Sequence, residues 1–459
     1  MDNPALDGWM GDNREVNENR SEPTSLAPRT CEENNHGSET QFVRTTIIHR
    51  RALTSGPWWH TATISEIPGV IDEEGAQCLQ DTVFAIARMG FSAVLFRPAL
   101  LDFDKQKQVL TDLIHAIHRV GMKAIVRLSG ADHAPTLPQE TPAAFFGYEG
   151  KTSALVVRAR AALLAGADGI DLGRIEDSPQ AAGSENQGER FTELTRLLLA
   201  ELAEFSPDHI LGAEAAAQYD ESLQRHLHEE WFHHLRDDRL AYVPFESVAI
   251  AKAVTTTIRE RDQLGAVCAW RAMLPRMMGT PGVDRSYLGS WEENADGTRR
   301  AAMRLVMCSL PGAIYLPFGF SGGHIEFEGP AVRVGPARDE AELERVRHTT
   351  LAIRIRNERQ LASGTFAFVT GMPWQREGVD VVMSGSVMVM LNTSDTQVWV
   401  PRDYRLLLRS DSSHQHDNPA VLGEDGATVA TAAIPVPGEA GTPVAAGAAA
   451  WFLPPRVGA

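Results

Sequence analysis

One short segment reads Gly166-Ala167-Asp168-Gly169-Ile170-Asp171-Leu172-Gly173, and its residues 169–172 have the pattern of a buried strand. A helical run covers residues 153–165 before it, and a second covers residues 192–203 after it. A short apolar strand between two helices is the repeating unit of a parallel sheet. This segment therefore predicts an α/β architecture.

The same alternation extends over residues 46–362. Further helices are predicted at residues 78–89, 105–119, 299–310 and 340–356. Strands are predicted at residues 62–67, 92–96, 123–128, 169–172, 210–215, 240–243, 276–279 and 313–318. Eight strand–helix repeats in about 300 residues predict a (β/α)8 TIM barrel, in which chemistry takes place at the C-terminal ends of the strands. The pattern favours this barrel over an open doubly wound sheet.

The two flanks of the barrel region differ from it in composition. Residues 1–45 are rich in Asn, Glu, Asp, Ser and Pro, which predicts a disordered acidic tail. Residues 363–459 alternate apolar and polar residues in short runs, as in Ser386-Val387-Met388-Val389-Met390-Leu391. Turn residues separate these runs, so we expect a C-terminal antiparallel β-sandwich domain.

Composition narrows the classes of partner. The chain has 459 residues, 43% of them hydrophobic, and a net charge of −17. This charge disfavours nucleic acid and anionic membrane surfaces, which are bound through basic residues. The chain has no signal-like start and no apolar run of about 18 residues. Four cysteines without disulfide-like or metal-like spacing suit a reducing compartment, so we expect a cytoplasmic protein.

Several segments, in the correct order, resemble the α-amylase family of retaining glycoside hydrolases. The resemblance covers residues 58–456 and implies a barrel followed by a sandwich. The frame Gly166, Asp168, Gly169 and Leu172 is similar to the strand that carries the family's nucleophile. The other matching segments are Trp58-Trp59, Ala62-Thr63-Ile64-Ser65-Glu66-Ile67, Gly121-Met122-Lys123-Ala124-Ile125-Val126, Leu211-Gly212-Ala213-Glu214-Ala215, Ser309-Leu310-Pro311-Gly312-Ala313-Ile314-Tyr315 and Leu391-Asn392-Thr393-Ser394-Asp395.

The resemblance assigns roles to individual positions. A retaining glycosidase needs a carboxylate nucleophile and a carboxylic acid/base roughly 5 Å apart. Glu214 stands at the acid/base position, in the Ala-Glu-Ala form similar to trehalose synthases. Gly173 stands at the nucleophile position, and Asp171 stands where an Arg supports the nucleophile. Ser65 replaces a Tyr that lines the sugar pocket. The chain therefore resembles a glycosidase that has lost its nucleophile.

The sugar-binding positions implied by the resemblance are also altered. After the third strand, Arg127, Ala131 and Asp132 stand where Asp, Asn and His are expected. His133 lies one position late and is a candidate substitute for that His. Near the seventh strand only Arg285 is retained, and the insertion after the third strand is short. The candidate substrate-binding residues are thus His133 and Arg285.

Two interpretations of the remaining acidic groups stay open. Asp171 could enter the old pocket and form a shifted catalytic dyad with Glu214, or it could form a structural ion pair with Arg174 or Arg127.

A separate histidine-rich run contains i,i+4 pairs that could chelate a metal, namely His226, His228, His233 and His234. Their spacing lacks a third ligand, so we predict a surface helix of mixed charge and no metal. No phosphate-binding glycine loop is present, and we expect no cofactor.

Two functions from different classes follow. The first is a catalytically impaired α-amylase-like protein that binds a sugar or a protein partner, or that regulates an active relative. The alternative is an active α-glucosidase or trehalose synthase-type enzyme whose rearranged site uses Glu214 and Asp171. An α-glucoside or oligosaccharide is the expected small ligand in either case.

Overall fold

The structure is a computed structural model. It describes residues 42–51, 56–98, 103–128, 153–175, 185–215, 217, 220–271, 297–321, 323–328, 331–411, 420–422, 428–430 and 441–455. Within this part of the chain, every helix is too short or too polar to cross a lipid bilayer. All structural statements below concern these residues.

Eight parallel strands form the barrel, in the order β7-β6-β5-β4-β3-β2-β9-β8. Strands β7 and β8, at the two ends of this order, also lie against each other. The strands are β2 (Thr63–Glu66), β3 (Ala93–Phe96), β4 (Lys123–Arg127), β5 (Gly169–Arg174), β6 (Ile210–Ala215), β7 (His234–Asp237), β8 (Ala269–Trp270) and β9 (Ala313–Pro317). The (β/α)8 barrel predicted from the sequence is confirmed.

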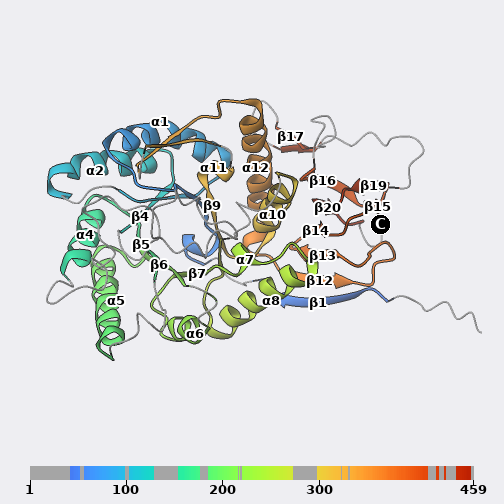
Figure 1. Cartoon of the computed structure of the whole chain (residues 1–459), viewed down its shortest axis with the longest axis horizontal. Coiled ribbons are helices and arrows are strands. Elements are labelled where there is room, and N and C mark those ends of the chain that lie inside the picture. Colours follow the sequence, from blue (N-terminus) through green and yellow to red (C-terminus); the bar gives the residue numbers. More distant parts are fainter. Residues whose placement is uncertain are drawn as a thin grey trace, which may run out of the picture. The chain divides into compact units, whose positions relative to one another are not determined.

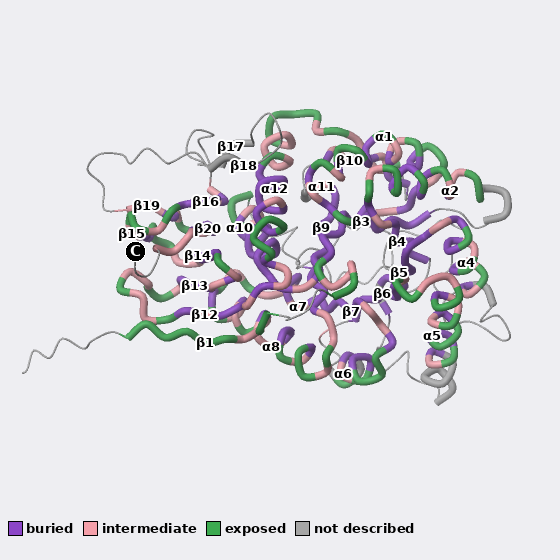
Figure 2. The backbone as a smooth tube through the Cα atoms, turned by 180° about the vertical axis from the view of Figure 1, so that it is seen from behind, coloured by how far each residue is buried: buried purple, intermediate pink, exposed green. Residues whose placement is uncertain are grey.

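Helices cover the outside of these strands (Figure 1). They are α1 (Glu73–Met89), α2 (Phe103–Arg119), α4 (Ser153–Leu164), α5 (Glu185–Phe205), α6 (Asp220–His228), α7 (Arg239–Tyr242), α8 (Ser247–Leu264), α10 (Gly297–Ser309), α11 (Phe318–Ser321) and α12 (Glu340–Glu358). A hairpin of β10 (His324–Glu328) and β11 (Ala331–Gly335) follows α11, and β11 packs against α1. Figure 2 shows the burial that results, because the barrel strands are mostly purple and the surrounding helices carry green on their outer sides.

Side chains inside the barrel form two levels. The N-terminal level is apolar and consists of Ala62, Ile64, Ala93, Leu95, Ile125, Ile210, Ala269, Ala313 and Tyr315. Toward the C-terminal ends of the strands the inward positions become charged. Because side chains alternate along a strand, Glu66 follows Ile64 into the interior, whereas Ser65 points outward. Ser65 is fully buried, and its hydroxyl has no hydrogen-bond partner among the described residues.

Asp168, which the opening sequence segment shares with the α-amylase pattern, lies at the N-terminal end of β5. Its carboxylate accepts hydrogen bonds from Lys123 Nζ at 2.8 Å and from the Ala124 amide at 2.8 Å, and it contacts His118 Nε2 at 2.7 Å. Burial would raise the pKa of Asp168, but these donors lower it overall. Asp168 thus ties α2 and β4 to β5, far along the strand from Gly173.

One predicted barrel strand is misplaced, and another lies outside the described residues. The sixth strand predicted at residues 240–243 is wrong, because residues 239–242 form α7 and the strand is β7. Two of the four residues of β7, His234 and Arg236, face the barrel interior as polar groups, so the apolar pattern of a buried strand is absent. The predicted strand at residues 276–279 lies outside the described residues. Strand β8 takes the seventh place in the barrel.

The C-terminal region contains antiparallel sheets that form the predicted sandwich. Six strands pair in the order β1-β12-β13-β14-β20-β16, and a ribbon of β15 (Val398–Pro401) and β19 (Gly441–Val444) packs on one face. The six are β1 (Arg44–His49), β12 (Phe366–Thr370), β13 (Val379–Ser384), β14 (Val387–Asn392), β20 (Ala449–Leu453) and β16 (Arg405–Arg409). Strands β17 (Ala420–Leu422) and β18 (Thr428–Ala430) form a separate hairpin.

Strand β1 belongs to the C-terminal sheet although it precedes the barrel in sequence. It pairs antiparallel with β12, and Arg44 lies opposite Thr370. The boundary predicted between the tail and the barrel, at residues 45 and 46, falls inside this strand. The sheet is therefore built from both sides of the barrel sequence.

The Leu-Pro-Gly segment between α10 and β9 has a conformation that only glycine adopts easily. Gly312 has φ +90°, and a Cβ atom placed there would lie 2.1 Å from the Cys268 carbonyl oxygen. The buried Arg356 guanidinium donates to the carbonyl oxygens of Cys308, Leu310 and Gly312. This turn fixes where β9 begins beside β8.

We expect Gly312→Ala to lower the free energy of unfolding by about 2–5 kcal/mol, since left-handed backbone and overpacking both disfavour alanine there. Gly121→Ala is the matched control, because Gly121 has φ +80° but no atom within 4 Å of the added Cβ. Its loss should be only about 1–2 kcal/mol. Urea denaturation of the two variants measures the difference, and equal losses would contradict the role of the close contact.

Candidate active site

Three carboxylates gather at the C-terminal ends of barrel strands, where TIM barrels place their chemistry. Glu66 ends β2, Asp171 lies in β5, and Glu214 lies near the end of β6. The exposed fraction of each residue is at most 1%. A buried carboxylate is costly unless it is paired, so the partners of these three groups determine what they can do.

Three arginines pair with the three carboxylates in an unbroken series. Asp171 Oδ2 lies 2.7 Å from Arg236 Nη1, and its Oδ1 accepts from Arg127 Nε at 2.8 Å. Glu66 Oε1 accepts from Arg127 at 2.8 Å and from Arg271 at 2.6 Å, and Arg271 also donates to Glu214. We call this series the ion chain; its order is Arg236, Asp171, Arg127, Glu66, Arg271, Glu214. Its formal charges balance, with three of each sign.

Asp171 is the most tightly held member of the ion chain. Burial alone would raise the pKa of Asp171, but Arg236 and Arg127 outweigh this and hold the pKa well below its usual range. Gly212 on the neighbouring strand leaves room for the contact, because a Cβ there would lie 2.7 Å from Asp171 Oδ2. Asp171 is therefore ionised and committed to two guanidinium groups.

Arg236 links the ion chain to the apolar N-terminal level of the barrel interior. Its guanidinium lies 4.3 Å from the ring centroid of Tyr315, a cation–π contact in a fully buried setting. The Tyr315 hydroxyl and His234 Nδ1 are 2.6 Å apart, and His234 Nε2 lies 2.8 Å from the Trp59 carbonyl oxygen. Burial lowers the pKa of His234 to about 3, so its ring is neutral, donates to Trp59 and accepts from Tyr315.

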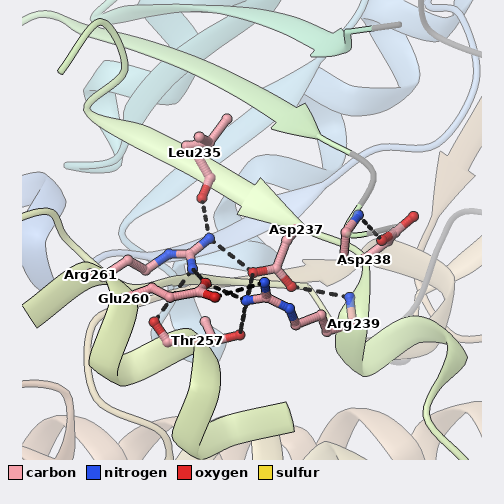
Figure 3. Close-up of polar contacts among 8 residues, drawn as sticks. Leu235, Asp237, Asp238, Arg239, Thr257, Glu260 and Arg261 are labelled. Atoms are coloured by element: carbon pink, nitrogen blue, oxygen red, sulfur yellow. Dashed lines mark hydrogen bonds and ion pairs between the residues drawn. The ribbon is translucent and has the colours of Figure 1, made fainter. Parts of the chain in front are cut away.

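A second set of charges anchors β7 from its outer side (Figure 3). Asp237 lies between Arg236 and Asp238, and its carboxylate accepts from the Arg239 amide at 3.0 Å. Arg261 of α8 reaches the Asp237 carboxylate at 2.9 Å and donates to the Leu235 carbonyl oxygen at 2.9 Å. These contacts fix the rotation of β7, which keeps Arg236 directed into the barrel.

Gly173, which the sequence resemblance assigns to the nucleophile position, lies in an irregular part of β5. The pairing of β5 with β6 shifts register between Asp171 and Arg174, and Gly173 has φ +66°. The Gly173 amide donates to Asp171 Oδ1 at 2.9 Å. The backbone at this position therefore turns back to support Asp171, and the position supplies no reactive side chain.

The residues predicted from the sequence divide into two groups. Glu214 and Asp171 both lie in the ion chain, but Arg127, Glu66 and Arg271 connect them in series. His133 and Arg285 lie outside the described residues. The ion pair between Asp171 and Arg127 was one of the two interpretations left open by the sequence, and it is present.

Sequence reasoning missed Glu66, Arg236 and Arg271 as members of the site. Arg236 was missed because the sixth strand was placed too late in the chain. Arg271 directly follows β8, whereas the seventh strand was predicted further along. A charged residue at the C-terminal end of a strand would have indicated a site residue. This signal can be used only when the strand itself has been located correctly.

Only the first part of the histidine-rich run, with His226 and the exposed His228, forms the predicted helix. Helix α6 ends at His228, His226 is buried against Phe191 and Trp231, and His234 lies on β7. His233 accepts a hydrogen bond from the Leu211 amide at 3.0 Å. Among the described residues, no three His, Cys, Asp or Glu side chains are grouped as metal ligands. The prediction failed for the rest of the run because the helix ends at His228 and His234 is a buried residue of β7.

No protein-family model matches the sequence, and no curated protein matches it either. Solved structures do resemble the fold. Ttha1563 from Thermus thermophilus is 12% identical with a TM-score of 0.52, over 86% of this chain and 99% of that chain. The γ-CGTase from alkalophilic Bacillus clarkii is 11% identical with a TM-score of 0.53, over 87% of this chain and 71% of that chain. The chain therefore shares its overall fold with these two proteins.

We expect Asp171→Asn to lower the free energy of unfolding by about 3–5 kcal/mol at pH 7, because it leaves two buried guanidinium groups short of one charge. The folded-state pKa of Asp171 is depressed, so its stabilisation is present above the ordinary carboxyl pKa of ~4 and is lost as the pH falls below it. The difference from wild type should therefore shrink from pH 5 toward pH 2.

Urea midpoints across this pH range measure the effect. The exposed Asp208 provides the control, since Asp208→Asn should change the midpoint little at any pH. A loss for Asp171→Asn that stays constant down to pH 2 would show that its charge is not the source of stability.

Proposed function

We propose that this chain is a catalytically impaired protein of the α-amylase fold that acts by binding rather than by hydrolysis. One observation carries the proposal: the nucleophile position is Gly173, and the acid/base position, Glu214, is ion-paired with Arg271. The order of the sequence segments that resemble α-amylases supports an α-glucoside or oligosaccharide as the ligand. A protein partner is the second class of ligand that the proposal admits.

The pairing of Glu214 opposes its use as a general acid. The family's acid must hold a proton and deliver it to the leaving oxygen. A carboxyl group that is held by a guanidinium group is directed at that partner rather than at a leaving oxygen. Glu214 is also only 1% exposed, and Arg271 lies between it and Glu66. Family chemistry at Glu214 would require this pair to separate first.

The alternative nucleophile, Asp171, is equally occupied. Its Oδ1 accepts from both Arg127 and the Gly173 amide, and its Oδ2 is paired with Arg236. A carboxylate attacks an anomeric carbon through a lone pair that is free to approach it. Active hydrolysis by Asp171 and Glu214 would therefore require the ion chain to break at both ends, which argues for a binding role.

We expect the purified protein to release no product from maltose, trehalose or nitrophenyl α-glucoside above background. Loss of a catalytic nucleophile typically removes several orders of magnitude of rate. Glu214→Gln should give the same background, and calorimetric titration with maltose and trehalose should reveal whether a sugar binds without turnover. Turnover that Glu214→Gln abolishes would refute the impaired-enzyme proposal in favour of the rearranged active site.

We also expect Gly173→Asp to remain at background in the same assays. The left-handed backbone at Gly173 strains any side chain by about 1–2 kcal/mol, and a second acid beside Asp171 is repelled by it. Adding Asp171→Arg should not restore activity, because that change removes the partner of Arg127 and Arg236. Gly173→Ala is the matched control, since it introduces the same backbone strain without a carboxylate.

Circular dichroism and thermal unfolding should accompany these variants to establish that each is folded. Hydrolysis by Gly173→Asp, or by its combination with Asp171→Arg, and not by Gly173→Ala would show that the sugar subsite survives intact. The chain would then have lost its chemistry at a single strand.

A further inference from the structure

The six-stranded sheet has two buried faces, and only one of them belongs to the sandwich core. On β13, Val379 and Val381 pack into that core, whereas Val382 packs with residues of the barrel helices. Ser384, on the same side as Val382, donates to the Ser309 carbonyl oxygen of α10 at 2.6 Å. We call the contact between this second face and helices α8 and α10 the seam.

Asp380 lies on the seam side of β13, opposite Leu391 of β14. A cavity of about 30 Å³ lies beside it, which is large enough for one or two water molecules. The cavity is lined almost wholly by apolar side chains, among them Ile250, Val254, Val306, Phe366, Phe368 and Val389. Asp380 is the one ionisable group among the described residues that line it.

Among the described residues, no charged side chain other than Asp380 lines the cavity. Helix α8 faces it with Ile, Ala and Val side chains, α10 with Val and Ser, the residue after α10 with Leu, and β12 and β14 with Phe, Val and Leu. Burial raises the pKa of Asp380 to about 6, and no charged side chain contributes to the rise. Neither an ion pair nor a hydrogen-bond donor to this partly buried carboxyl group is seen among the described residues.

We propose that Asp380 makes the seam an acid-tightened contact, closely packed while this carboxyl group is protonated and loosened when the group ionises. An ionised carboxylate in apolar surroundings is costly and gains most by reaching water. Asp380 is not fully buried, so a small separation of β13 from α8 hydrates it. The seam then loosens as the pH rises, independently of the ion chain inside the barrel.

The sign of the effect follows from linkage. The folded-state pKa of Asp380 is above its unfolded value, so the full stabilisation is present below pH 4 and is lost as the pH rises through about 6. Linkage then predicts that Asp380 raises the unfolding equilibrium constant about 50-fold between pH 4 and pH 7. Asp380→Asn has no proton to lose and should escape this change.

The test compares the full chain with Asp380→Asn, and uses Asp395→Asn as an exposed control from the turn after β14. Urea midpoints are measured from pH 4 to pH 7.5, together with native-state hydrogen exchange of α8 and β13, expressed as protection factors. We expect the wild type and Asp395→Asn to lose stability relative to Asp380→Asn as the pH rises through 6. Protection in α8 and β13 should fall over the same range only when Asp380 is present.

Either of two results would overturn the proposal. The first is a pH dependence of the urea midpoint that is the same in all three proteins. The second is a relative loss of stability in the wild type without a change of protection at the seam, since Asp380 would then act on global unfolding alone. Asp380→Leu provides a further check, because it should keep the seam protected throughout the pH range.

Discussion

The ion chain is the interaction on which the C-terminal end of the barrel depends. It connects the C-terminal ends of β2, β4, β5, β6 and β7 and the residue after β8, through alternating guanidinium and carboxylate groups. Each of these charges has been taken out of water, which is favourable only if the partners are present together. The members therefore support one another, and the outer contacts of Asp237 with Arg261 hold β7 in the rotation that Arg236 needs.

The ion chain also determines whether its carboxylates are available for catalysis. A retaining glycosidase needs two carboxyl groups that can reach the substrate. Here the three carboxylates are held by arginines, and the backbone at Gly173 donates to Asp171 instead of presenting a reactive group. The barrel interior is thus organised as a core with polar contents.

The barrel and the sandwich could be predicted from the sequence because their apolar periodicity is local. Strand β7 could not, since His234 and Arg236 occupy interior positions that normally carry apolar side chains. The partners of Asp171 come from strands far apart in the chain, and a single sequence does not reveal such pairing. Arg127 could be named from the sequence as a possible partner of Asp171, because it ends a strand with a clear apolar pattern. Arg271 could not, because it follows a strand of only two residues. Strand β1 could not be predicted either, because its partner β12 follows the whole barrel in the sequence.

The position of β1 has a consequence for how the chain is made. During synthesis β1 emerges before the barrel, but its partner β12 emerges only after the barrel is finished. Until then a strand containing Thr45, Thr46, Ile47 and Ile48 has no ladder to join, and unpaired β-branched strands are prone to join others. The barrel is in effect an insertion within the sheet, so a separately expressed C-terminal fragment would lack its edge strand. Strand β1 can therefore complete its pairing only after the whole barrel has been synthesised.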